Sequence, residues 1–189
     1  MVPEVQHLIR SLGELPEPVA EPALIIISGL PGTGKSYLSK RLAERVRFLV
    51  LESDALRKTL FSPPSYSFRE SPKLFQTIHR LLRELLNKGI PLVLDATNLS
   101  ERFREQLYSI ADRLNVRVIL VRVEAPPEVV YRRLESRARD AENRSDADWV
   151  VYRRMRPSVD KIRRNHYVVD TSRDITPVLD KIVREVARR

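Results

Sequence analysis

The sequence predicts an α/β fold in which helices cover both faces of a parallel sheet. Short apolar runs, rich in leucine and β-branched residues, alternate with longer segments that carry helical spacing. The first apolar run, at residues 23–28, is followed at once by a glycine-rich segment and then by a helical pattern. A strand, a glycine loop and a helix in this order form the context that a phosphate-binding loop requires.

The chain divides into a short extension at residues 1–22 and one domain at residues 23–189. Apolar residues of the extension share one face of a predicted helix, namely Val5, Leu8, Ile9 and Leu12. Three prolines between residues 16 and 22 then make a stiff linker. We expect the short helix to pack on the surface of the domain.

Within the domain, strands and helices alternate in a regular order. The predicted strands are Ala23–Ser28, Phe48–Leu51, Pro91–Leu94, Val116–Val123 and Tyr167–Val169. The predicted helices are Tyr37–Val46, Pro72–Asn87, Ser100–Leu114, Pro127–Arg139, Trp149–Met155 and Thr176–Ala187. Ser100 is the expected N-cap of its helix. Two irregular insertions, at residues 62–68 and 140–148, are the loops where we expect function to concentrate.

The segment after the first strand fits the phosphate-loop pattern G-x-x-x-x-G-K-[ST]; it reads Gly29-Leu30-Pro31-Gly32-Thr33-Gly34-Lys35-Ser36. Glycines let backbone N–H groups approach phosphate oxygens closely, and the following helix start adds further donors. Lys35 would neutralise the β- and γ-phosphates, and the hydroxyl of Ser36 would ligate Mg²⁺. We therefore expect ATP and Mg²⁺ as cofactors. The residues assigned to the nucleotide are Gly29, Pro31, Gly32, Thr33, Gly34, Lys35, Ser36, Tyr37, Arg137 and Thr171.

Acidic residues follow three of the predicted strands, at the edge where ligands bind in parallel α/β sheets. Asp54 follows the second strand, with Arg57 about one helical turn later. Asp95 ends the third strand and is followed by Thr97 and Asn98. Phosphoryl transfer needs one carboxylate to deprotonate the acceptor and another to hold the metal ion. The spacing leaves open whether Asp54 or Asp95 is the base, and Ser36 is the one metal ligand that we assign.

Arginines are dense after the fourth strand. Arg133 and Arg137 are four residues apart and would share one face of a helix. Guanidinium groups can meet the charge of a transferring phosphoryl group with two hydrogen bonds. We therefore assign both arginines, with Lys35 and Asp54, to catalysis, and we expect an arginine-rich helical lid at about residues 132–155.

Composition excludes several classes of protein. The chain has 189 residues, 42% of them hydrophobic and 31% charged, with no apolar run long enough to span a membrane. The absence of cysteine excludes disulfides and cysteine catalysis, and the cytoplasm is the expected compartment. The net charge of +9 suits a polyanionic partner or a phosphate pocket, but an arginine-rich solvated surface explains it equally well.

Taken together, these residues resemble the P-loop kinases related to polynucleotide 5′-hydroxyl kinase, a group that includes zeta-toxin, gluconate and chloramphenicol kinases. Ser53-Asp54-x-x-Arg57 resembles the family's D-x-x-R, and residues 95–99 resemble its D-x-T-N-L. Residues 133–137 resemble the R-x-x-x-R of the lid. The resemblance covers the chain from Ala23 onward. It implies a three-layer P-loop NTPase kinase fold with a five-stranded parallel sheet in the order 2-3-1-4-5.

The resemblance also implies roles for the assigned residues. Asp54 would be the general base on the acceptor hydroxyl, and Arg57 would contact an acceptor phosphate. Asp95 would support the acceptor site, to which we also assign Thr97 and Asn98. The two lid arginines would bracket the phosphates of ATP.

The expected activity is transfer of the γ-phosphoryl group of ATP to an acceptor hydroxyl. The first hypothesis for the acceptor is a 5′-hydroxyl of DNA or RNA, with Tyr66 and Phe68 stacking on an unpaired base. The second is a small-molecule alcohol, such as a sugar, an antibiotic or a nucleotide-sugar. A third hypothesis is a nucleotide-binding module without phosphotransfer; the pair of Asp54 and Arg57 and the arginine-rich lid argue against it.

Overall fold

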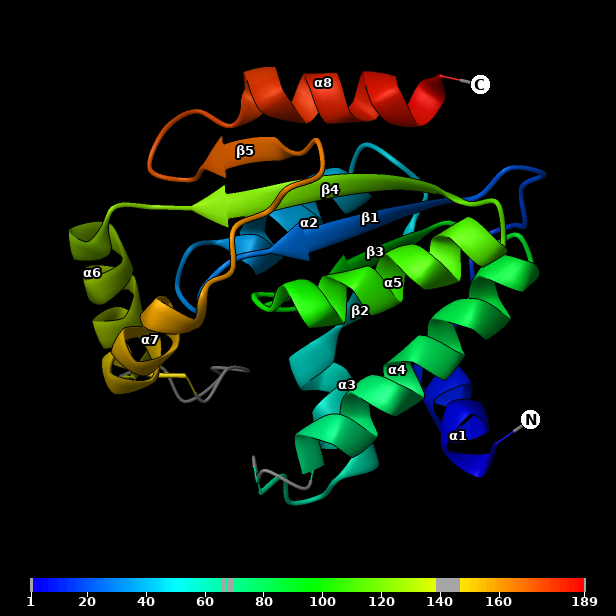
Figure 1. Ribbon diagram of the computed structural model, residues 1–189, viewed down its shortest axis with the longest axis horizontal. Coiled ribbons are helices and arrows are strands. Elements are labelled where there is room, and N and C mark those ends of the chain that lie inside the picture. The colour runs from blue at the N-terminus through cyan, green and yellow to red at the C-terminus, as the bar shows by residue number, and fades with distance from the viewer. Residues whose placement is uncertain (1, 66, 68–69, 139–146, 189) are drawn as a thin grey trace.

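A five-stranded parallel sheet forms the centre of the molecule (Figure 1). The computed structural model describes residues 2–65, 67, 70–138 and 147–188. The strands are β1 (Ala23–Ser28), β2 (Leu49–Glu52), β3 (Leu92–Asp95), β4 (Arg117–Glu124) and β5 (Tyr167–Asp170). Their order is β2-β3-β1-β4-β5, and every neighbouring pair is parallel. The order implied by the family resemblance is therefore confirmed.

Strand β1 lies in the middle of the sheet and is buried along its whole length. Its side chains alternate between two apolar clusters: Leu24 and Ile26 belong to one, Ile25 and Ile27 to the other. Covering both faces explains why the strand reads as a continuous apolar run. Because Ile27 pairs with Asp95 of β3, the carboxyl ends of these two strands lie side by side.

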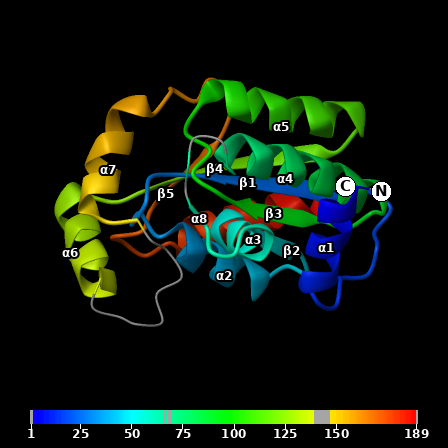
Figure 2. The same cartoon turned by 90° about the horizontal axis from the view of Figure 1, so that it is seen from below.

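Helices cover both faces of the sheet (Figure 2). One face carries α4 (Glu70–Asn87) and α5 (Glu101–Arg113), and the other carries α2 (Lys35–Ala43) and α8 (Thr176–Ala187). The helices of the predicted lid, α6 (Pro127–Ala138) and α7 (Trp149–Met155), lie beyond the carboxyl ends of the strands, and the short 3₁₀ turn η1 (Arg156–Ser158) follows. None of the helices in these described ranges is both long and apolar enough to cross a bilayer.

Two helices surround the edge of the sheet near β2. Helix α1 (Pro3–Ser11) packs against α3 (Ser53–Leu60) and α4, with Val5 and Leu8 fully inside the larger core cluster. Helix α3 was not among the predicted helices, but it carries Asp54 and Arg57 one turn apart, as their spacing suggested. The position of the first acidic group therefore depends on a helix of eight residues.

The start of α5 confirms the position of the predicted N-cap but not a capping bond from its side chain. Ser100 occupies the N-cap position, but its side chain makes no capping hydrogen bond. The backbone N–H of Glu101 instead donates to Asp160 Oδ2 at 2.8 Å. A carboxylate from a distant segment satisfies a donor that the serine leaves open, so tertiary structure supplies the cap.

Candidate active site

The phosphate loop is held in place by its backbone. The N–H of Gly29 donates to the carbonyl of Thr97 at 3.0 Å, and a Cβ on Gly29 would lie 2.5 Å from the carbonyl oxygen of Val123. Gly34 has φ +95°, a conformation that side chains disfavour, and its Cβ would lie 2.9 Å from Thr171 Oγ1. Larger residues at either position would therefore displace the loop.

A chain of hydrogen bonds fixes the outer side of the loop. The hydroxyl of Thr171, which follows β5, donates to the carbonyl of Thr33 at 2.6 Å. Arg133 of α6 donates to Thr171 Oγ1 at 2.7 Å and to its carbonyl at 2.8 Å. The structure thus connects the loop, the end of β5 and the first lid helix through Thr171.

A cavity of about 150 Å³ opens beside the loop. Its walls come from the phosphate loop, the ends of β2 and β3, and the lid; they are Pro31, Gly32, Gly34, Lys35, Ser36, Glu52, Ser53, Asp54, Asp95, Ala96, Thr97, Arg137, Ala147, Val151 and Met155. The fold therefore brings together groups that are far apart in the sequence. Arg133 and Tyr37 are not among these lining residues, and Tyr37 is 51% exposed.

Lys35 begins α2 at the base of this cavity. Its ammonium donates to the carbonyl of Leu30 at 3.1 Å. Burial lowers the pKa of Lys35, while the carboxylates of Asp95 and Asp54 oppose that shift and Arg137 adds to it. The lysine therefore lies in the field of both acidic groups and of the lid arginine.

The two acidic residues differ in how they are held. Asp95 is buried and accepts a hydrogen bond from Ser39 Oγ at 3.0 Å. Asp54 accepts no hydrogen bond from any residue in the described part of the chain. Burial raises the pKa of Asp54 above its ordinary value, although Lys35 and Arg57 oppose the shift. A carboxyl group with a raised pKa in a cavity is the better candidate for a general base.

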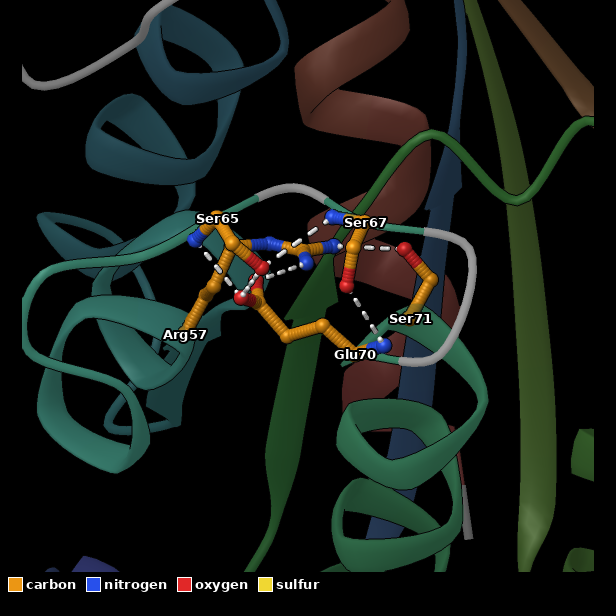
Figure 3. Close-up of polar contacts among 5 residues, drawn as sticks. All are labelled: Arg57, Ser65, Ser67, Glu70 and Ser71. Atoms are coloured by element: carbon orange, nitrogen blue, oxygen red, sulfur yellow. Dashed lines mark hydrogen bonds and ion pairs between the residues drawn. The ribbon is translucent and has the colours of Figure 1, made fainter.

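Arg57 is not among the residues that line the cavity; its polar contacts lie with the start of α4 (Figure 3). Its guanidinium forms an ion pair with Glu70 of α4 at 2.6 Å and donates to Ser71 Oγ at 3.3 Å. Both side chains of the ion pair are almost completely buried. In this arrangement, the arginine that we expected to contact an acceptor phosphate already has a carboxylate partner.

Glu70 is the residue that sequence analysis missed on this side. The N–H and the hydroxyl of Ser65 donate to Glu70 Oε2 at 2.7 and 2.6 Å (Figure 3). Burial alone would raise the pKa of Glu70, but hydrogen bonds from Ser65 and Arg57 outweigh it and lower the pKa to about 2. No spacing rule pairs residues 57 and 70, because the loop between them sets their separation.

Thr97 and Asn98, the two polar residues that follow Asp95, lie in different surroundings. Thr97 lines the cavity. Asn98 is 3% exposed, with φ +46°, and its amide donates to the carbonyl of Ile27 at 2.7 Å. The structure therefore places Asn98 in the framework that joins β1 to the end of β3, rather than in the cavity wall.

A second residue missed by sequence analysis is Arg104. It is 1% exposed and donates to the carbonyls of four residues, which are Asn98, Leu99, Asp160 and Lys161. These carbonyls belong to the loop after β3 and to the segment that returns from the lid. Arg104 therefore fixes the end of the lid against the loop that carries Thr97. The helical spacing of apolar residues, which predicted α5, does not indicate that an arginine on this helix is buried or which carbonyls it contacts.

Part of the predicted lid lies outside the described residues, including Arg139 and Arg144; so do Tyr66 and Phe68. In the described part, Trp149 stacks on Tyr152 with ring centroids 4.8 Å apart and meets Tyr131 edge-on at 5.2 Å. This aromatic cluster joins α6 to α7, so the two lid helices pack on each other.

The donor set fits Mg²⁺ that is bound together with nucleotide phosphates. Ser36, Asp54 and Asp95 line the same cavity. The residues that the structure describes contain no group of three or more histidine, cysteine or acidic side chains suited to a metal. Magnesium in phosphoryl-transfer sites takes one or two protein ligands, with water and phosphate oxygens completing the shell. The cavity supplies that small number.

Comparisons with known proteins identify the family of the chain and its fold. A family model described as an AAA domain matches residues 24–162. A shikimate kinase from Nitrobacter winogradskyi is 32% identical over 135 residues, which make up 68% of this chain and 61% of that protein. The chain therefore spans about three fifths of the length of this relative.

Solved structures show the same fold at low identity. The APS kinase of Mycobacterium tuberculosis in complex with AMPPNP and APS has a TM-score of 0.67 at 14% identity, covering 89% of this chain and 99% of that chain. A gluconokinase from Sinorhizobium meliloti has a TM-score of 0.64 at 17% identity, covering 88% and 93%. The AAA-domain match covers well over half of the chain, including the phosphate loop, Asp54, Asp95 and Arg137. The chain therefore belongs to this AAA domain family and has the α/β fold of P-loop kinases.

Proposed function

We propose that the protein transfers the γ-phosphoryl group of ATP to a hydroxyl group of a small molecule. One observation carries this proposal: Lys35, Arg137 and the carboxyl group of Asp54 line one cavity beside the phosphate loop. A charged group for the phosphates, a lid arginine and an acid with a raised pKa are the parts that phosphoryl transfer to an alcohol needs.

On the nucleotide side, backbone N–H groups of the loop would surround the phosphates, and Lys35 would neutralise their charge. Ser36, together with Asp95 or Asp54, would hold Mg²⁺, which supplies further neutralisation of phosphate charge when it is bound. Tyr37 and Thr171 remain proposed nucleotide contacts. Arg133 reaches the nucleotide side in this structure through its hydrogen bonds to Thr171.

On the acceptor side, Asp54 would take the proton of the acceptor hydroxyl as its oxygen attacks the γ-phosphorus. The new oxygen–phosphorus bond forms as the bond to the bridging β–γ oxygen breaks, and ADP leaves. Arg137 would meet the charge on the transferring group with its planar guanidinium. Asp95, which Ser39 holds in place, would support the acceptor rather than deprotonate it.

The state of Arg57 favours a small acceptor over a polynucleotide. This arginine is ion-paired with Glu70 and does not line the cavity. A polynucleotide acceptor needs a cationic group for its own phosphate, and Arg57 was the residue expected to supply it. The similar proteins named above are a shikimate kinase, an APS kinase and a gluconokinase, whose names refer to small molecules.

The test is transfer of labelled phosphate from ATP to a panel of acceptors. The panel contains shikimate, gluconate, APS, unphosphorylated nucleosides and a 5′-hydroxyl oligonucleotide. We expect labelled product from a small alcohol, and a rate of labelling that is lower by about 10²-fold or more in the Asp54→Asn variant. Labelling of the oligonucleotide alone would support the polynucleotide hypothesis instead. Binding of ATP with no acceptor labelled would favour a nucleotide-binding module without phosphotransfer.

A further inference from the structure

A groove with a volume of about 1260 Å³ lies between α4 and α5. It lies on the face of the sheet that these two helices cover, and it shares no lining residue with the candidate active site. Its residues come from α4 and the segment before it, and from α5. The groove therefore belongs to a surface that the proposed phosphoryl transfer does not use.

Two aromatic rings form part of the floor. Phe75 of α4 and Phe103 of α5 stack on each other with centroids 5.2 Å apart and planes inclined by 21°. Phe103 is 39% exposed, so part of a large apolar ring faces solvent. Ile110 adds a buried apolar side chain beside them. An exposed ring that is fixed by a second ring offers a flat platform for stacking.

The rims of the groove are basic. Arg83, Arg102 and Arg113 line it, and each is exposed. Within the part of the chain that the structure describes, none of these three guanidinium groups makes a hydrogen bond or an ion pair. The lining carboxylate, Glu105, already lies 3.7 Å from Arg164. The groove thus presents cationic groups that no neighbouring acid neutralises.

The remaining lining residues include a histidine and several neutral polar side chains. Burial lowers the pKa of His79, and the nearby charge of Arg83 lowers it further. Amide and hydroxyl groups complete the wall; they are Gln76, Gln106, Ser67, Ser71 and Ser109. These groups can donate and accept hydrogen bonds without adding negative charge.

We propose that this groove binds a single-stranded nucleic acid. A basic groove that follows the phosphate backbone, combined with aromatic rings on which bases stack, is the usual design of such sites. An amphipathic protein helix with acidic residues is the competing occupant, but a polyanionic strand engages both features of the groove, the three guanidinium groups and the stacked rings. The bound strand lies outside the active site, so this inference does not depend on the proposed function or on the identity of its acceptor.

The test measures the binding of fluorescein-labelled oligo(dT) to the full chain by anisotropy, as salt is raised from about 50 to 200 mM. One variant combines Arg83→Gln, Arg102→Gln and Arg113→Gln. Each phosphate contact on a single strand contributes about 0.7 to the slope of log affinity against log salt, so the slope should fall by about 2. Phe103→Ala should weaken binding on the order of tenfold by removing the stacking platform.

The matched control removes the same charge from the opposite face of the sheet. It combines Lys40→Gln, Arg47→Gln and Lys181→Gln, three exposed residues on or near α2 and α8. This variant should keep the affinity and the salt slope close to those of the wild type. Circular dichroism and thermal melting confirm that every variant is folded.

Three results would overturn the proposal. One is binding that the groove variants leave unchanged, and another is an equal loss in groove and control variants, because binding would then depend on total charge. The third is an acidic amphipathic peptide that binds with dependence on Phe103 while oligo(dT) does not bind, which would make the groove a protein-docking surface.

Discussion

The two halves of the candidate active site are built in different ways. On the nucleotide side, the loop between β1 and α2 is shaped by backbone geometry, with Gly34 at φ +95° and Gly29 packed against the carbonyl of Val123. On the acceptor side, the groups are side chains from separate elements: Asp54 lies on α3, and Asp95 ends β3. The loop of the first half is contiguous in sequence, whereas tertiary packing brings the groups of the second half together.

The difference shows in how charges are paired. Lys35 lies at the base of the cavity, in the field of two carboxylates. Arg57, which the same reasoning assigned to the acceptor, is ion-paired with Glu70 and buried. The local motif that contains Lys35 lies at the cavity, whereas the motif that contains Arg57 does not specify the partner of this arginine, because that partner comes from another helix.

The largest expected effect is on the nucleotide side. Lys35→Ala should lower the rate of phosphoryl transfer on the order of 10³-fold, because one preorganised charge at the transferring group is lost. Single-turnover measurement with labelled ATP checks this. The control is Lys40→Ala, an exposed lysine on the same helix, which should behave like the wild type. Equal activity in the Lys35 variant would mean that the phosphate loop is not the reaction site.

The next largest effect distinguishes the roles of Asp54 and Asp95 on the acceptor side. Asp54→Asn should lower kcat by about 10²-fold or more while leaving the affinity for ATP within a few-fold. Asp112→Asn, at the far end of α5, is the matched control. If the affinity for ATP falls along with kcat, Asp54 either binds the metal ion or is needed for the folded structure of the site. Asp95 then becomes the candidate base.

The pH dependence follows from the same residue. Because burial raises the pKa of Asp54, the ionised form that accepts a proton appears only above the usual range for aspartate. We expect kcat/KM to rise with pH through this raised pKa and the rise to be absent in the Asp54→Asn variant. If kcat/KM of the wild type no longer rises with pH above the ordinary pKa of aspartate, this assignment is wrong.

A smaller effect on the kinetics is expected from substitutions of the two lid arginines, Arg133 and Arg137. Arg137 lines the cavity, whereas Arg133 donates to Thr171. Arg137→Lys should lower kcat, because an ammonium cannot reproduce the two parallel hydrogen bonds of a guanidinium. Arg133→Lys should act mainly on the KM for ATP, since its contacts are with the framework of the nucleotide side. Steady-state kinetics with varied ATP separates the two; a larger fall in kcat for Arg133→Lys would reverse the roles.

The smallest effect is on stability. The pKa of Glu70 is lowered from 4.5 to about 2, so its carboxylate stabilises the folded state above pH 4.5, and this contribution is lost as pH falls towards 2. Glu70→Gln should therefore lower Tm most at neutral pH, with the difference from the wild type vanishing near pH 2. Glu84→Gln, which removes the half-exposed partner of Lys88 near the end of the same helix, should change Tm little. A difference in Tm that does not depend on pH would exclude the ion pair as its cause.

The sequence by itself determined the strands of this protein and the loop that we propose for the nucleotide phosphates. The predicted strands agree with those of the structure to within one residue at each end, because apolar runs covered on both faces leave few alternatives. The phosphate loop could be predicted because its geometry depends on glycines and one helix start within eight consecutive residues. The order of the sheet came from the family resemblance and was confirmed.

Only the tertiary structure decided which polar side chains meet across elements. Asn98 bonds to β1 instead of lining the cavity, Arg104 bridges two loops that are far apart in sequence, and Glu70 neutralises Arg57. The groove between α4 and α5 likewise exists only because two helices separated by β3 lie on the same face. Hydrogen bonds and ion pairs act over a few ångströms, and the local patterns of a sequence do not specify which distant groups come within that range.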